Sequence, residues 1–162
     1  MKKTILIILL LPNLLCCKKK AIVDYKPIEI PCTLTKEIDT ARLYIKGYWN
    51  WLEEKRYNRG LQKTIYLTPQ NQGYTLSMKL SNDTAYFFKN NVPDSVYTYK
   101  VLRQNEITGT NYPEDQDPAL VFYRTYDGQR NSYVPLKICS NYLILQYQFV
   151  RSIEGEQIWK KQ

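Results

Sequence analysis

The chain of 162 residues contains no histidine. This absence excludes a Ser–His–Asp or Cys–His nucleophile pair, a histidine general base and a histidine metal ligand. No CxxC pair occurs among the four cysteines, which excludes a structural zinc finger. The six glycines are scattered along the chain, so no glycine-rich loop is available to cradle a phosphate. We therefore expect no enzymatic activity, no cofactor and no metal site.

Two charged stretches are read as solvated. Residues 114–117 (Glu-Asp-Gln-Asp) place carboxylates at alternating positions, which suits a calcium ion. This stretch lacks the glycine and the glutamate of an EF-hand loop, so we expect a solvated loop. Residues 53–56 (Glu-Glu-Lys-Arg) are expected to be a charged surface stretch. Neither stretch is predicted to carry chemistry.

The N-terminus has the form of a secretory signal peptide. Lys2 and Lys3 precede an almost purely apolar run over residues 4–15. A helix needs about 20 apolar residues to cross a bilayer, so this run is too short to be a membrane span. A buried core helix fits poorly, because Pro12-Asn13 interrupts the run. We expect residues 1–16 to be removed from the mature protein.

The end of the leader resembles the lipobox of bacterial lipoproteins, in the residues Leu14-Leu15-Cys16-Cys17. This resemblance implies cleavage after Cys16 and a diacylglyceryl-modified Cys17. Acylation of Cys16, secretion without a lipid and an uncleaved anchor are the alternatives. Two or three acyl chains on one cysteine are enough for stable attachment to a membrane. Because Lys18 follows, and not the aspartate that marks inner-membrane retention, we expect an outer-membrane lipoprotein that faces the periplasm or the outside.

The basic charge is concentrated near the expected lipid. The whole chain carries +8, and removal of the leader with Lys2 and Lys3 leaves +6. Lys18, Lys19 and Lys20 hold three of these charges, beside the lipid, where they help to hold the chain at an anionic surface. An oligonucleotide-binding barrel is disfavoured, because the remaining body has little net charge and the protein is exported.

The two remaining cysteines are candidates for one disulfide. Cys32 and Cys139 are the only thiols left after lipidation of Cys17, and the cell envelope is an oxidising compartment. We expect them to be bonded. The alternative is two buried free cysteines that pack as small apolar side chains.

The body of the chain reads as a succession of short strands. Residues 17–35 contain two prolines and no clean period, and are expected to be a tether. Residues 36–46 predict a short amphipathic helix that Gly47 ends. Residues 53–69 indicate a loop or an irregular strand pair, and 103–118 a long polar connection. Alternating apolar and polar residues predict strands at 48–52, 73–80, 84–89, 96–102, 120–126, 132–139, 142–150 and 157–161.

These eight strands follow each other in meander order, with the last turn expected at Glu154-Gly155. A meander of this kind hides its edges best by closing on itself. We therefore predict an all-β domain over residues 36–162: an eight-stranded antiparallel up-and-down barrel preceded by a short helix. Such a barrel is filled by side chains or holds one small ligand. A two-sheet sandwich is the rival arrangement.

Several short motifs resemble the lipocalin (calycin) pattern, and more closely the lipocalin-like domain of small Gram-negative lipoproteins. They are Gly47 to Trp51, Thr68-Pro69, Gly73 to Leu80, Asn141 to Leu145 and Gly155 to Lys161. The resemblance implies that Gly47 and Trp49 close the barrel floor under a basic side chain, for which Arg151 and Lys160 are the candidates. It also implies a barrel that holds an apolar ligand, without identifying one.

Tyrosine is abundant, with 15 residues against 4 phenylalanines. Tyrosine fits half-buried strands, and it also favours binding surfaces because one end of the ring is apolar and the other polar. The candidate lining residues are Tyr74, Tyr86, Tyr97, Tyr99, Tyr123 and Tyr147. Trp49 is expected to be structural.

Two functions remain open. The first is a lipid-anchored cell-envelope protein that holds a small apolar or amphipathic ligand in its barrel. The second is a tethered accessory or inhibitor protein that binds a protein or glycan through its two long loops, 53–72 and 103–118.

Overall fold

The computed structural model describes residues 25–162 except 59, 61, 111, 113–115 and 150–152. The expected signal peptide over residues 1–16, the acylated Cys17 and the candidate Arg151 lie outside the described residues. Among the helices of the described part, none combines the length and the apolar character that a bilayer span requires.

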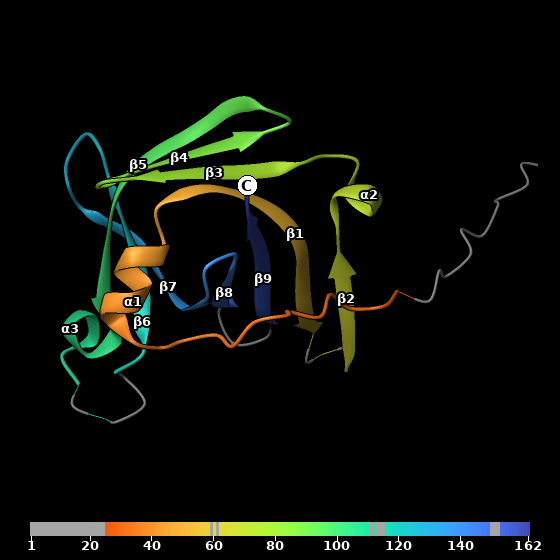
Figure 1. The fold of residues 1–162 in the computed structure, drawn as a ribbon, viewed down its shortest axis with the longest axis horizontal. Coiled ribbons are helices and arrows are strands. Elements are labelled where there is room, and N and C mark those ends of the chain that lie inside the picture. The colour runs from red at the N-terminus through yellow and green to blue at the C-terminus, as the bar shows by residue number, and fades with distance from the viewer. Residues whose placement is uncertain (1–24, 59, 61, 111, 113–115, 150–152) are drawn as a thin grey trace, which may run out of the picture.

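Strands dominate the described chain, with three short helices between them (Figure 1). In order they are α1 (Ile38–Tyr44), β1 (Gly47–Asn58), β2 (Lys63–Leu67), α2 (Pro69–Gln72), β3 (Leu76–Ser81), β4 (Thr84–Lys89), β5 (Val92–Arg103), α3 (Gln104–Thr108), β6 (Pro118–Arg124), β7 (Arg130–Ile138), β8 (Tyr142–Phe149) and β9 (Ile153–Lys161).

The sheet closes into a barrel, as predicted. Sequential antiparallel pairing joins β3 to β9, β1 pairs with β3, and β9 returns to β1 from Trp49↔Lys161 to Asn58↔Ile153. Eight strands therefore form a closed antiparallel barrel with the short helix α1 before it. β2 is a ninth strand, which hairpins onto β1 in the region where the sequence indicated a loop or an irregular pair.

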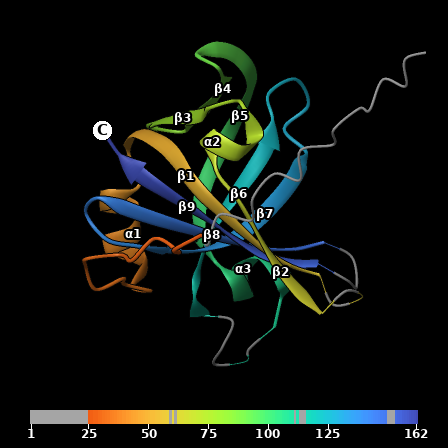
Figure 2. The same cartoon turned by 90° about the vertical axis from the view of Figure 1, so that its right-hand side faces the viewer.

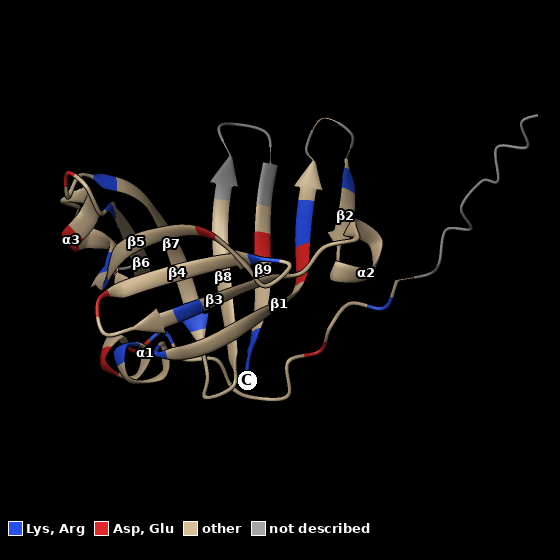
Figure 3. Cartoon of the chain, turned by 90° about the horizontal axis from the view of Figure 1, so that it is seen from above, with Lys and Arg blue, Asp and Glu red and all other residues tan. Residues whose placement is uncertain are grey.

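The barrel is continuous at the α1 end and splits at the other end. On one edge, β1 pairs with β3 only over Gly47–Asn50 and then with β2 over Glu54–Asn58. On the far side, β7 pairs with β8 only over Leu136–Ile138. As a result β8, β9, β1 and β2 form one group of strands that separates from the group β3–β7 (Figure 3). The split creates two seams, one between β2 and β3 and one between β7 and β8.

The seam between β2 and β3 is covered by the chain that connects them. Thr68 and Asn71 form a reciprocal capping box at α2, and Gly73 ends this helix with φ +72°. The next residue, Tyr74, then stacks on Trp51 inside the barrel, with ring centroids 5.8 Å apart. These local contacts close the first seam.

The half of the barrel near α1 is packed solid. The helix lies across this end and buries Ile38 and Ala41, with Ile45 beside them (Figure 2). Six large inward side chains in this half are at most 1 % exposed: Trp49, Met78, Leu80, Leu120, Leu136 and Leu143. Side chains this well covered leave no room for a ligand or water beside them. A deep central cavity at this end is therefore ruled out.

The floor of the barrel differs in detail from the expectation. α1 ends at Tyr44 with Ile45 as its C-cap, and Gly47 is the first residue of β1, not the end of the helix. Trp49 Nε1 donates to the Ile45 carbonyl at 2.7 Å. The cation above the Trp49 ring is Lys161, whose Nζ lies 5.3 Å from the ring centroid and donates to the Tyr44 carbonyl at 2.9 Å. The candidate Lys160 alternates to the outer face, so Lys161 takes the role proposed for it.

Gly47 is expected to tolerate no side chain. Its φ is +137°, and a Cβ would come 2.5 Å from Cε of Lys161. We predict that Gly47→Ala lowers the free energy of unfolding by about 2 kcal/mol, because the backbone is strained and Lys161 must leave Tyr44. Gly128→Ala is the matched control, since it has φ +67° but open space around it. Equal losses in urea denaturation of the two variants would contradict the collision with Lys161.

Residues 25–35, here called the strap, lie against the barrel and do not extend from it as the predicted tether. In Figure 1 this orange segment runs from α1 past β8, β9 and β1 toward β2. Thr35 forms a two-bond bridge with Ile138, and Cys32 forms a disulfide with Cys139. Farther along, the Tyr25 hydroxyl and the Ile28 amide both donate to Glu53. The strap is therefore held at both of its ends.

Candidate functional site

A β-bulge in β1 decides which charged side chains enter the barrel. Trp51 pairs with Trp159, the next pair is Glu53↔Ile158, and Leu52 is the extra residue. Because strand side chains alternate, one extra residue moves every later side chain to the opposite face. Glu54 therefore points inward, and Glu53 points outward beneath the strap.

The expectation that residues 53–56 form a charged surface stretch holds for Lys55 but is wrong for the two glutamates. Glu53 is 1 % exposed and Glu54 is 5 % exposed. The Glu54 carboxylate accepts hydrogen bonds from Arg56 Nε and from the Tyr147 hydroxyl, and from Gln157 Nε2 at 3.1 Å. A buried carboxylate requires donors of this kind, since it loses its hydration on burial. β1, β8 and β9 thus supply a polar cluster inside the barrel at its split end.

The two titratable groups that donate to Glu54 have altered pKa values. The hydrogen bond to Glu54 raises the pKa of the Arg56 guanidinium. Burial raises the pKa of the Tyr147 hydroxyl, and its hydrogen bond to Glu54 adds to this effect. Arg56 therefore stays charged and Tyr147 stays protonated, which makes the cluster a neutral ion pair with an attached phenol.

A glycine positions Tyr147. Gly155 pairs with Tyr147 across β8 and β9, so it lies within a strand and not in the predicted turn at Glu154-Gly155. A Cβ on Gly155 would come 2.3 Å from the Tyr147 ring. The ring therefore rests directly on the backbone of β9, where only glycine leaves enough space.

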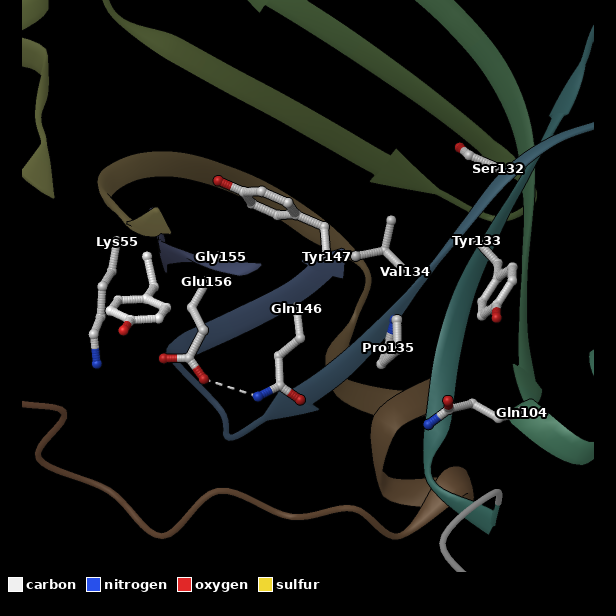
Figure 4. Close-up of a pocket in the computed structure, with 11 residues that line it drawn as sticks. Lys55, Gln104, Ser132, Tyr133, Val134, Pro135, Gln146, Tyr147, Gly155 and Glu156 are labelled. Carbon is white, nitrogen blue, oxygen red and sulfur yellow. Dashed lines mark hydrogen bonds between the residues drawn. The ribbon is translucent and has the colours of Figure 1, made fainter. Parts of the chain in front are cut away.

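A pocket of about 940 Å³ opens where β7 leaves β8 (Figure 4). The volume falls within the range of about 300–1,000 Å³ that is usual for small-molecule sites. Gln146 donates to Glu156 at 2.8 Å on its wall. Its lining residues are Lys55 and Tyr57 from β1, Gln104 at the start of α3, residues 132–135 from β7, Gln146 and Tyr147 from β8, and Gly155 and Glu156 from β9.

Of the six candidate tyrosines, only Tyr147 lines this pocket. Tyr74, Tyr97 and Tyr99 face inward and pack in or against the core. Tyr86 and Tyr123 do not line the barrel interior as expected. Both lie on the outer face, next to the inward-facing Ala85 and Phe122. The strand register causes this difference. Ala85 and Phe122 occupy the inward positions, so the adjacent Tyr86 and Tyr123 must face outward.

Sequence reasoning missed several residues of the pocket. Tyr57 and Tyr133 are 38 % and 40 % exposed and line it from opposite sides, from β1 and β7. Gln104, Gln146 and Glu156 had no motif that marked them. Only the divergence of β7 from β8 brings these residues to one opening, and no local pattern in the sequence encodes it.

No cluster of three metal-ligating side chains occurs within the described ranges. Asp117, the last residue of the acidic stretch, pairs with Lys36 at 2.6 Å. Residues 113–115 lie outside the described part, so the predicted solvated loop stays a prediction.

Alkaline conditions are expected to weaken the fold through Tyr147. The phenol ionises near its ordinary pKa of 10.0 in the unfolded chain but keeps its proton in the folded one, whose pKa is raised. Above pH 10 the folded state therefore binds more protons, and the free energy of unfolding falls as pH rises. Urea denaturation between pH 7 and 11 should show this fall for the wild type and a smaller one for Tyr147→Phe. A constant difference between the two proteins across this range would contradict the prediction.

Comparison with known proteins found no matching family model, no matching curated sequence and no matching solved structure.

Proposed function

We propose that the protein is a lipid-anchored cell-envelope protein that binds a small amphipathic molecule in the pocket between β7 and β8. The observation that carries this proposal is that one of the two seams is covered and the other is open. The seam between β2 and β3 is covered by α2 and Tyr74, whereas the seam between β7 and β8 opens into a pocket of about 940 Å³. The solid packing at the α1 end restricts a ligand to this opening.

The polar cluster supports the same site. Glu54, Arg56 and Gln157 form a structured floor next to the pocket, and Tyr147 belongs both to this cluster and to the pocket wall. A pocket with mostly aromatic and apolar surfaces and a few convergent polar groups is typical of small-molecule sites. We find no observation that favours catalysis there.

The alternative function, a tethered accessory or inhibitor protein, has less support. It relied on long loops at 53–72 and 103–118. Residues 53–72 contain the β1–β2 hairpin and the capped α2, and α3 begins the second segment. The surfaces expected to bind a partner through flexible loops are thus partly regular structure.

The proposed anchor places the barrel near the membrane. Eight residue steps separate Cys17 from Tyr25, and a fully extended chain of that length spans at most about 28 Å. Because the strap is bonded to Glu53 from Tyr25 onward, the barrel itself is held within this distance of the lipid. We expect Cys17→Ser to abolish metabolic labelling with palmitate and membrane fractionation, and Cys16→Ser to retain both. The reverse pattern would assign the lipid to Cys16, and labelling of both variants would contradict a single anchor.

Binding is tested on the full chain extracted from cell membranes. Native mass spectrometry of the wild type is expected to show an additional noncovalent mass. Tyr133→Ala, which removes one wall of the pocket, should lose this mass. Tyr86→Ala is the matched control, because Tyr86 is similarly exposed but does not line the pocket. No bound mass in the wild type, or equal retention by both variants, would contradict a ligand site between β7 and β8.

A further inference from the structure

We propose that the ligand of the pocket between β7 and β8 is an uncharged polyhydroxylated ring, such as one sugar unit of a glycan. This inference rests on the proposed function and adds the chemical class of the ligand. It follows from the hydrogen-bonding groups, the charge and the aromatic surfaces that meet in the pocket.

The wall carries groups that both donate and accept hydrogen bonds. Gln104 and Gln146 are amides and Ser132 is a hydroxyl, so each of them offers a donor and an acceptor. Gln146 is already oriented by its bond to Glu156 at 2.8 Å, and no other side-chain hydrogen bond of the described part involves Gln146 or Glu156. The Gln146 oxygen and the second Glu156 oxygen therefore remain as acceptors. Sugar hydroxyls both donate and accept, and so can satisfy this mixed set.

The charges of the pocket cancel. Lys55 and Glu156 are its charged lining residues, and they are direct partners in the β1–β9 register. Behind the wall, Glu54 is paired with Arg56. A phosphate or a fatty-acid carboxylate would meet as much repulsion as attraction here, so the electrostatics favour an uncharged ligand.

Three tyrosines supply flat surfaces along the pocket. Tyr57 and Tyr133 lie on the outward strand faces, the same side as Gln146 and Glu156, whereas Tyr147 lies on the inward face of β8. Tyr57, Tyr133 and Tyr147 come from β1, β7 and β8, and Tyr147 is held in place by Glu54 and Gly155. A tyrosine ring packs against the C–H face of a sugar while its hydroxyl remains in a polar environment. A purely apolar chain would fit the rings but would desolvate Gln104, Gln146 and Glu156 without offering them partners.

The test uses the full lipidated chain in vesicles of phosphatidylethanolamine and phosphatidylglycerol. Isothermal titration calorimetry would measure maltotriose, cellotriose, chitotriose and mannotriose as uncharged sugars, and decanoate as the apolar anion. We expect saturable binding of at least one trisaccharide. Tyr133→Ala and Glu156→Ala should each weaken it about tenfold, as expected when a central contact is lost. Tyr86→Ala should leave it unchanged. Because Tyr133 is 40 % exposed, its removal is not expected to unfold the barrel.

The outcomes separate the two proposals. Saturable decanoate binding that depends on Tyr133, with no trisaccharide binding, would overturn the sugar assignment and leave the binding site between β7 and β8 in place. Trisaccharide binding that is equal in the wild type, Tyr133→Ala and Glu156→Ala would overturn this pocket as the sugar site. If no trisaccharide and no decanoate bind, the sugar assignment is overturned. The native mass spectrometry experiment then tests independently whether the pocket binds any ligand.

Discussion

Removal of the Cys32–Cys139 disulfide is expected to lower the free energy of unfolding by about 4 kcal/mol. The bond joins positions 107 residues apart, so it restricts the unfolded chain over most of the described protein. Urea denaturation of the double variant Cys32→Ser/Cys139→Ser against the oxidised wild type measures the loss. The wild type in excess reductant is the matched control and should lose the same amount. A difference below about 1 kcal/mol would show that the constraint on the unfolded chain is not realised.

The same variant should loosen the strap locally. The disulfide holds the middle of the strap at the end of β7, next to the Thr35–Ile138 bridge. Without it, the N-terminal part is held by the bonds from Tyr25 and Ile28 to Glu53 and by the contact of the Tyr25 ring with Tyr66. We expect the Ile28 amide, which donates to Glu53 at 3.1 Å, to exchange with solvent faster in the double variant. Unchanged protection of this amide would mean that the strap is held without the disulfide.

Loss of the Glu54 carboxylate is expected to cost about 2–4 kcal/mol, because it leaves several inward donors without an acceptor. The Tyr147 hydroxyl and the Gln157 amide are confined within the barrel. Arg56 loses its partner too, but its side chain is 42 % exposed and can turn to water, so its share of the loss is small. Urea denaturation of Glu54→Ala provides the measurement.

Two comparisons make the Glu54 result specific. Glu106→Ala removes an exposed carboxylate on α3 and is expected to change the free energy of unfolding by less than about 0.5 kcal/mol. In a double-mutant cycle, Tyr147→Phe should cost less in the Glu54→Ala background than in the wild type, because its acceptor is already gone. Additive losses would show that the two side chains are not coupled.

Much of the fold was predictable because the signals for strands and turns are local. The strand expected at 84–89 is β4 with the same bounds, and Asn90 and Asn91 turn the chain after it with positive φ. Alternation identifies a strand, and asparagine tolerates the left-handed backbone that a tight hairpin needs. The bonding of Cys32 to Cys139 was also expected, from the number of cysteines and the compartment.

The polar cluster and the pocket were not predictable in this way. One extra residue, Leu52, moves Glu54 into the barrel, and a bulge carries no clear sequence signature. Lys161 and not Lys160 reaches Trp49, since the register of β9 decides which of two adjacent lysines faces inward. The outward placement of Tyr86 and Tyr123 has the same cause.

The amino-acid sequence was enough to predict a barrel of antiparallel strands preceded by one short helix. The alternating apolar pattern and the turn residues that predict it each span only a few positions. The expected leader and the proposed acylation of Cys17 also rest on short linear patterns, which are read without a fold. That Tyr74 covers one seam while the other opens beside Tyr147 follows from the assembled barrel and from no local pattern. The reason is physical: the pairing lengths of neighbouring strands and a one-residue bulge depend on how the whole sheet twists and closes, not on any single segment.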